Sequence, residues 1–479
     1  MLNYDEFIFP NPQEKICIVK AENPNNFRGS KLSKDLKLYN IIMEELNHPF
    51  FKSMIKILQC SRNLSKNVYG PNVLYLSENE GCFPRTGLHI KEGESYEYFP
   101  ELNYVDLVLD EERVLNGELY IYTHELAHTM LKNLLPNFPH GKSSIPHFSQ
   151  CITDYFTAFD EGFAEQFERV TCENVPRYLE IKRNNFNFEC NFLKLWICNF
   201  DKDLRYEGVF KNNFIYKKFM PKVDNLSIEN SLLLEQVSPN FDATKLKTGA
   251  EMLSCEGVVA TILYNICTDK ILQKNYTYRH IYNKFLIKTL PANADIKDVF
   301  SPYENVLIKI LWVMYNLADR IKEDSPVLIN FIENWCEYFP EDKERIINIF
   351  INITAGKTIE NDAGRIYEQI AIEGMFGMAE AVSNSILQYR KHIKALCSKV
   401  IKGEISIGQN VPKELWIENK RVTAPKISFS DLNTQAMMIN LNTASIMQLM
   451  SFPKITLEAA NKILSDREDG RFIDENNIL

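Results

Sequence analysis

The sequence lacks both a long apolar run and an excess of positive charge. Its 479 residues carry a net charge of −9, which gives no general attraction to nucleic acid or anionic lipid. The apolar stretch at 306–318 is interrupted by Lys309 and is shorter than the roughly 20 residues of a membrane helix. Residues 1–15 include acidic side chains and lack the apolar region of a secretory signal. We therefore expect a cytoplasmic protein that does not cross a membrane.

The cysteines also lack the pattern of a disulfide framework. There are eleven, an odd number, and no two form a CxxC pair. Several lie in apolar surroundings, such as Cys198 after Trp196 and Ile197, which favours reduced, buried thiols. No internal repeat and no low-complexity tract is visible.

The length of the chain predicts two or three domains, because single cores rarely grow beyond about 250–300 residues. Turn signals and short apolar runs fill the first 110 residues and predict a small sheet, whereas helical periodicity dominates later. The fold class is therefore expected to be mainly α with a small β-sheet. The segments that carry this prediction are a strand at 104–109, helices at about 115–135 and 152–170, a helical bundle over 251–353 and some β character at 415–422.

One predicted helix carries a metal-binding pattern, His124-Glu125-Leu126-Ala127-His128. The spacing of four residues places both imidazoles on one helix face, where they can bind the same ion. A catalytic zinc takes three protein ligands and keeps a position for water. Glu125 is then placed to act as the general base that activates this water. The alternative is a helix that carries two histidines by coincidence, so the third ligand decides.

The metzincin class would need a glycine and a third histidine soon after the motif, but residues 129–134 read TMLKNL. Further along, residues 159–168 read FDEGFAEQFE on the second predicted helix. With the first motif, this segment resembles the gluzincin metallopeptidases, especially the aminopeptidase N-like group. The resemblance covers residues 119–168 and implies a zincin-like catalytic domain, a Zn2+ cofactor and Glu161 as the third zinc ligand. The small residues Gly162 and Ala164 would let this helix pack closely against the first.

Two departures from that group limit the substrate assignment. The gap between His128 and Glu161 is longer than in the aminopeptidases, and the G-x-M-E-N segment that recognises a free amino terminus is absent. Aminopeptidase activity is therefore not expected. The extra length falls in the loop at 136–148, which contains His140 and His147 as alternative ligands.

Other residues are candidates for supporting roles. A ligating histidine usually donates its second N–H to an acceptor, and Glu165 and Asp160 are the candidates here. Glu256 opens an apolar helix and is either an active-site acid or a favourable helix N-terminal charge. A side chain that polarises the substrate carbonyl is not identified by the sequence, but the candidates are Tyr206, Tyr264, His280 and Tyr282.

The C-terminal residues 439–479 resemble the helix-hairpin-helix module of ComEA-type competence proteins. In that family the hairpin reads P-G-I-G, and its glycines let backbone amides approach a DNA phosphate. Here the hairpin is Pro453-Lys454-Ile455-Thr456, and acidic residues outnumber basic ones from 429 to 479. We therefore expect a structural or protein-binding role for this module rather than DNA binding.

Together these features predict a zinc metallopeptidase that acts on a peptide or protein. A non-catalytic zinc-containing scaffold, a DNA-associated protein acting through its C-terminal module, or a peptidase acting on DNA-bound proteins or a regulator are the alternatives. The expected domains are a zincin-like domain at 1–250, a helical domain at 251–411, a linker at 412–428 and the degenerate helix-hairpin-helix module at 429–479.

Overall fold

The computed structural model describes residues 3–23, 27–78, 81–179, 205–219, 227–238, 240–424 and 436–474. The chain divides into two compact units, the first made of residues 1–138, 166–182 and 266–319 and the second of residues 139–165, 183–265 and 320–479. About 54% of the described residues are helical and strands are also present, so the mixed α and β composition is confirmed. None of the helices in the described ranges is long and apolar enough to span a membrane.

The β part of the first unit is a closed barrel rather than the small sheet that the sequence predicted. Its strand order is β1-β2-β4-β5-β3, and β3 pairs with β1 to close it. Three of the pairings are parallel, and each joins two strands that do not follow one another along the chain. A local sequence pattern does not reveal such pairings between distant segments. Side chains such as Val19, Tyr75 and Tyr104 form a core cluster of the barrel. The strands are β1 (Cys17–Asn23), β2 (Arg28–Lys31), β3 (Val73–Leu76), β4 (Phe83–Glu92) and β5 (Ser95–Leu107).

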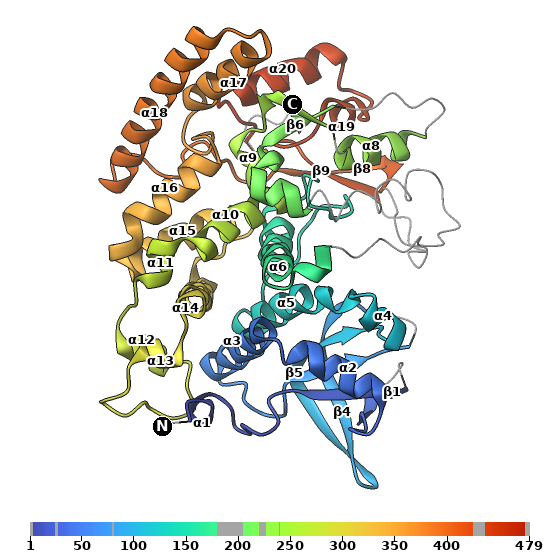
Figure 1. Ribbon diagram of the computed structural model, residues 1–479. Helices are drawn as coiled ribbons and strands as arrows, with labels where there is room; N and C mark the ends of the chain where they lie inside the picture. The colour runs from blue at the N-terminus through green and yellow to red at the C-terminus, as the bar shows by residue number, and fades with distance from the viewer. Residues whose placement is uncertain are drawn as a thin grey trace. The chain divides into compact units, whose positions relative to one another are not determined.

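Helix α5 (Tyr122–Leu134) contacts α3 (Pro49–Ser65) and strands β4 and β5 in the same unit (Figure 1). It corresponds to the helix predicted at 115–135, of which the first part forms the short helix η2 (Glu118–Ile121) instead. The other helices of this unit are α1 (Asp5–Ile8), α2 (Lys37–Leu46), α4 (Glu111–Leu115), η3 (Pro176–Leu179), α11 (Lys270–Lys274), α12 (Arg279–Asn283), α13 (Ile296–Val299) and α14 (Pro302–Tyr315), followed by η5 (Ala318–Arg320) at its end.

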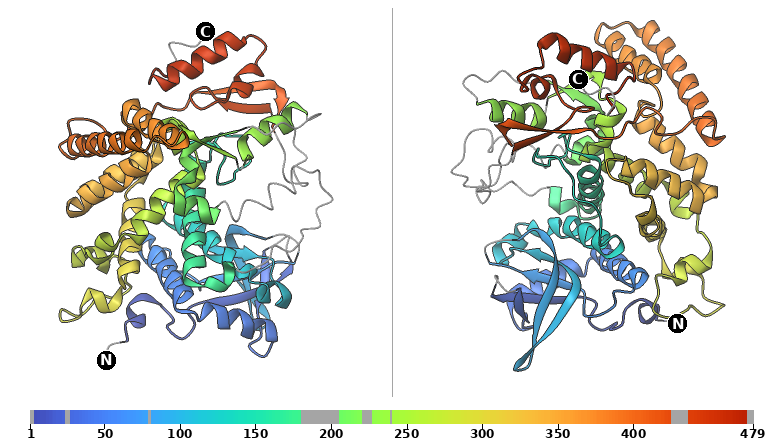
Figure 2. Two further views of the ribbon diagram at one scale, coloured as in Figure 1. Left: turned by 45° about the horizontal axis from the view of Figure 1, so that its top comes forward. Right: turned by 180° about the vertical axis from the view of Figure 1, so that it is seen from behind.

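Two helices, α6 (Tyr155–Asn174) and α10 (Glu256–Thr268), contribute residues to both units. Helix α6 corresponds to the helix predicted at 152–170. The second unit is otherwise mostly helical in its described part, and α17 (Asn361–Met375) and α18 (Ala379–Ile401) lie side by side as a hairpin in both views of Figure 2. Its further elements are η4 (Asn213–Ile215), β6 (Tyr216–Lys218), α8 (Ile228–Val237), β7 (Phe241–Leu246), α9 (Gly249–Leu253), α15 (Val327–Tyr338), η6 (Pro340–Asp342) and α16 (Lys343–Ile353).

The C-terminal part of the second unit combines a two-stranded sheet with two helices. Strand β8 (Trp416–Thr423) lies in the segment expected to be a linker and pairs antiparallel with β9 (Ala436–Asn440). Helices α19 (Ile446–Met450) and α20 (Leu457–Glu468) follow, and residues 453–456 lie between them. Their apolar side chains share a core with residues of α8, so this segment packs as part of the unit.

Candidate metal centre

The metal-binding pattern lies on a helix that is buried on almost all sides. Every residue of α5 except Lys132 is buried, including His124, Glu125 and His128, whose exposed fractions are only 7%, 5% and 6%. A surface helix that carried two histidines by coincidence would expose them. Buried polar side chains instead require partners, because an unsatisfied buried group is costly.

The two imidazoles converge on one point. Nε2 of His124 lies 3.1 Å from Nε2 of His128, and the ring planes are inclined at 72°. Two tetrahedral zinc ligands at about 2.0–2.1 Å from the ion lie about 3.4 Å apart, so this separation fits two ligands of one ion. The helix therefore arranges both nitrogens by its own periodicity, as the spacing predicted.

Glu161 completes the group that the sequence predicted. One ligand atom each from His124, His128 and Glu161 lie within 4.8 Å of one another. Helix α6, which carries Glu161, is joined to α5 by contact between the Thr123 and Thr171 hydroxyls, whose oxygens lie 2.7 Å apart.

The acidic residue beside His124 is Glu168, not Glu165 or Asp160 as predicted. Oε1 of Glu168 is 2.7 Å from Nδ1 of His124, the nitrogen that faces away from its partner histidine. Glu168 follows Glu161 by seven residues, or two helical turns, and so shares its face of α6. That spacing was the signal that could have found it. Of the predicted candidates, Asp160 is half-buried and Glu165 accepts a hydrogen bond from Ser149 Oγ at 2.6 Å.

The donor set could hold a metal ion, and its chemistry is compatible with zinc. Two imidazole nitrogens and one carboxylate are ligands that zinc prefers, and three protein ligands leave a position for water or substrate. In the described part of the chain, the group contains no fourth histidine, cysteine or acid. A carboxylate beside the outer nitrogen of a ligating histidine fixes its tautomer and raises its basicity, which is the position of Glu168.

A second cluster of possible metal ligands in the second unit also includes Glu161. His147, Glu161 and Glu256 also bring ligand atoms within 4.8 Å of one another. Glu256 is fully buried, and among the described residues neither of its carboxylate oxygens has a hydrogen-bond partner. Burial raises the pKa of Glu256 well above its ordinary value, and the nearby carboxylates of Glu165 and Glu161 raise it further.

The packing of Gly162 corrects one expectation and explains this proximity. A Cβ at Gly162 would lie 2.6 Å from Cβ of Val259 and 2.8 Å from the backbone oxygen of Glu256. The glycine therefore permits close approach of α6 to α10, whereas the sequence led us to expect α5 as the partner at this position. This contact places Glu161, the neighbouring residue, beside Glu256.

The remaining candidates are distributed over the chain. His140 is exposed and belongs to neither of the two groups found in the described residues. In α12, His280 stacks on Tyr278, and the Tyr282 hydroxyl accepts a hydrogen bond from the backbone N–H of Thr277 at 3.0 Å.

The two other tyrosines predicted as candidates lie in the second unit. Tyr206 is half-buried and Tyr264 is buried on α10. Neither position identifies the group that would polarise a substrate.

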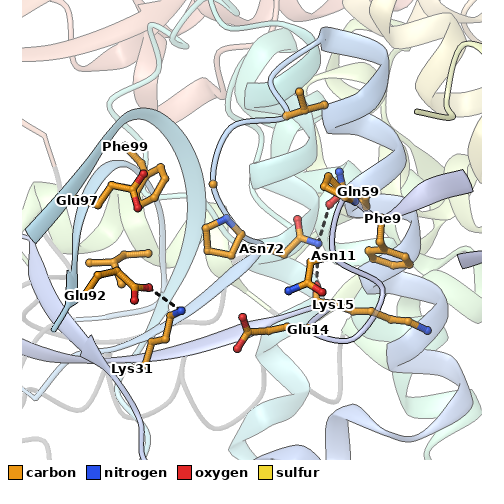
Figure 3. Close-up of a pocket in the computed structure, with 15 residues that line it drawn as sticks. Phe9, Asn11, Glu14, Lys15, Lys31, Gln59, Asn72, Glu92, Glu97 and Phe99 are labelled. Carbon is orange, nitrogen blue, oxygen red and sulfur yellow. Dashed lines mark hydrogen bonds and ion pairs between the residues drawn. The ribbon is translucent and has the colours of Figure 1, made fainter. Parts of the chain in front are cut away.

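A cavity of about 390 Å³ opens in the first unit and is lined mainly by the segments that precede β1 and β3, together with residues of β2, β4 and β5 (Figure 3). It contains an ion pair between Lys31 and Glu92 at 2.6 Å. Asn72 donates hydrogen bonds to Gln59 and to the backbone oxygen of Lys15. None of its lining residues belongs to the metal group, so the cavity gives no support to the predicted chemistry.

Comparison with known proteins identifies no relative. No family model matches the chain, and neither a curated protein nor a solved structure matches it. The function must therefore be argued from the site itself.

Proposed function

We propose that this protein is a zinc-dependent metallopeptidase of the gluzincin kind. The observation that supports this most strongly is the convergence of His124, His128 and Glu161 in one group. Two of these residues come from a pattern with local helical spacing, whereas the third comes from a separate motif on another helix. A coincidental HExxH sequence would give no reason for that third residue to reach the histidines.

The residues would divide the chemistry of hydrolysis among them. His124, His128 and Glu161 would hold zinc, which supplies a Lewis acid and lowers the pKa of a coordinated water to about 7. Glu125 would accept the proton of the water that attacks the peptide carbonyl, and return it to the leaving amine. Glu168 would hold the His124 ring with Nε2 directed toward the ion.

Glu125→Gln tests this role without removing a ligand. The variant should retain zinc, measured by mass spectrometry of the metal, but should lose about 10²- to 10⁴-fold in the cleavage of a random quenched-fluorescent peptide library. The exposed Glu112→Gln, in the same unit, is the control and should cleave like the wild type.

The zinc requirement needs its own test. A chelator should remove the cleavage activity and added Zn2+ should restore it, while His128→Ala should be inactive and deficient in zinc. Cleavage by Glu125→Gln at the wild-type rate, or undiminished activity of metal-free protein, would contradict the proposal.

For the C-terminal module we propose a structural or protein-binding role rather than DNA binding. Arg467, one of its few basic residues, is only 1% exposed and donates hydrogen bonds to the backbone oxygens of Leu441 and Ala444. Arg471 pairs with Asp466 at 2.7 Å. These guanidinium groups are engaged within the module, which lowers the positive charge available to a phosphate. Retarded migration of duplex DNA in a gel-shift assay at physiological salt, if it is lost in Lys454→Glu, would overturn the proposal that this module does not bind DNA.

A further inference from the structure

The group formed by His147, Glu161 and Glu256 shares Glu161 with the α5 histidines, and all three of its residues belong to the second unit. Nδ1 of His147 lies 3.6 Å from Oε2 of Glu161 and 3.9 Å from Oε1 of Glu256. Ligands of one zinc ion lie about 3.4 Å apart, so only small side-chain movements separate these atoms from a coordination sphere.

Glu256 gives independent evidence that this group has a ligand. It is fully buried, and in the described ranges neither carboxylate oxygen has a hydrogen-bond partner. A buried, charged carboxylate of this kind is costly unless it is paired, coordinates a metal or takes up a proton. The side chain of His147, the histidine of the group, is 56% exposed. An ion can therefore reach the group from solvent.

The backbone around the group is fixed, so the approach of these side chains is built into the fold. The backbone N–H of Gly257 donates to Ser149 O at 2.8 Å, and that of Thr153 donates to Ser254 O at 2.7 Å. These bonds attach the loop that carries His147 to the start of α10. On the other side, Gly162 brings α6 against α10.

We propose that His147, Glu161 and Glu256 form a second divalent-cation site, with Glu161 shared between it and the zinc centre. A carboxylate has two oxygens and can bridge two ions, and paired metal sites with ions about 3.5–4 Å apart serve hydrolytic enzymes. One imidazole and two carboxylates suit Zn2+ or Mn2+. The second ion would add positive charge beside the first, where a substrate oxygen becomes negative.

The test is the zinc stoichiometry of the full chain, measured by calorimetric titration of metal-free protein and by metal analysis after gel filtration. We expect two ions per chain for the wild type and one each for His147→Ala and Glu256→Gln. His140→Ala is the matched control, an exposed histidine of the same loop that lies outside the group, and should bind two. His147→Ala removes an exposed side chain, so it remains informative if Glu256→Gln does not fold.

His128→Ala separates this inference from the proposed function, because it removes a ligand of the zinc centre alone. It should keep one ion, which the double variant His128→Ala/His147→Ala should lose. A wild type that binds a single ion, lost in His128→Ala and kept in His147→Ala and Glu256→Gln, would overturn the second site and leave the zinc centre intact. A single ion lost in His147→Ala but kept in His128→Ala would support the second site and contradict the zinc centre.

Discussion

Replacing Gly162 by alanine tests the close contact between α6 and α10. The added methyl group would lie 2.6 Å from Cβ of Val259 and 2.8 Å from the backbone oxygen of Glu256. Carbon atoms in good contact are about 3.5–4.0 Å apart, so the shortfall is about 1 Å. The backbone oxygen cannot rotate away, and the helices must therefore move apart.

The expected cost follows from two opposing effects. Overpacking of a buried contact costs typically about 1–3 kcal/mol, whereas glycine to alanine in a helix gains about 0.5–1 kcal/mol. We therefore expect Gly162→Ala to lower the free energy of unfolding by up to about 2.5 kcal/mol. Gly374→Ala is the matched control, because Gly374 lies in α17 of the same unit with no atom within 4 Å of the new methyl group.

Urea unfolding of metal-free protein, followed by circular dichroism, measures both changes. The control should raise the free energy of unfolding by about 0.5–1 kcal/mol, the gain of alanine over glycine in a helix, and so raise the urea midpoint. Gly162→Ala should lower both. A Gly162→Ala variant as stable as the control would show that α6 and α10 do not approach each other as closely as described, and would remove the reason for Glu161 to lie beside Glu256.

Two further predictions concern buried carboxylates. Glu168→Gln should retain zinc but weaken its binding by about 10- to 100-fold, measured by competition with a chelator, because the negative charge beside His124 is lost; unchanged affinity would contradict this. Burial raises the pKa of Glu414 to about 8, compared with about 4 in an unfolded chain. The folded protein then holds a proton that the unfolded chain releases, so the free energy of unfolding should fall as pH rises from about 4 to about 8. Glu414→Gln should flatten this decline, and an unaltered pH profile would refute the assignment.

The sequence predicted the parts of the site that depend on local geometry. His124 and His128 share a face because any α-helix places residues four apart on one side. Glu161 was predicted through resemblance to a second motif, and the structure brings it to the histidines. The two helices themselves were predicted from apolar periodicity, to within a few residues at most ends.

Contacts between distant segments were not predictable in the same way. The position of Glu168 beside His124 depends on how α5 and α6 align, which no local pattern specifies. Gly162 indicated a close approach, but not that the partner would be α10. The barrel was missed because its parallel pairings, such as Cys17 with Val73, join separate parts of the chain. His147 and Glu256 were each considered, but nothing in the sequence indicated that they meet.

The most direct test of the zinc centre is a crystal structure of the zinc-loaded protein, with anomalous diffraction recorded on both sides of the zinc absorption edge. The proposal predicts a zinc peak about 2.0–2.2 Å from Nε2 of His124, Nε2 of His128 and a carboxylate oxygen of Glu161. No zinc peak at these residues in crystals grown with saturating zinc, or an ion that Glu161 does not bind, would contradict it.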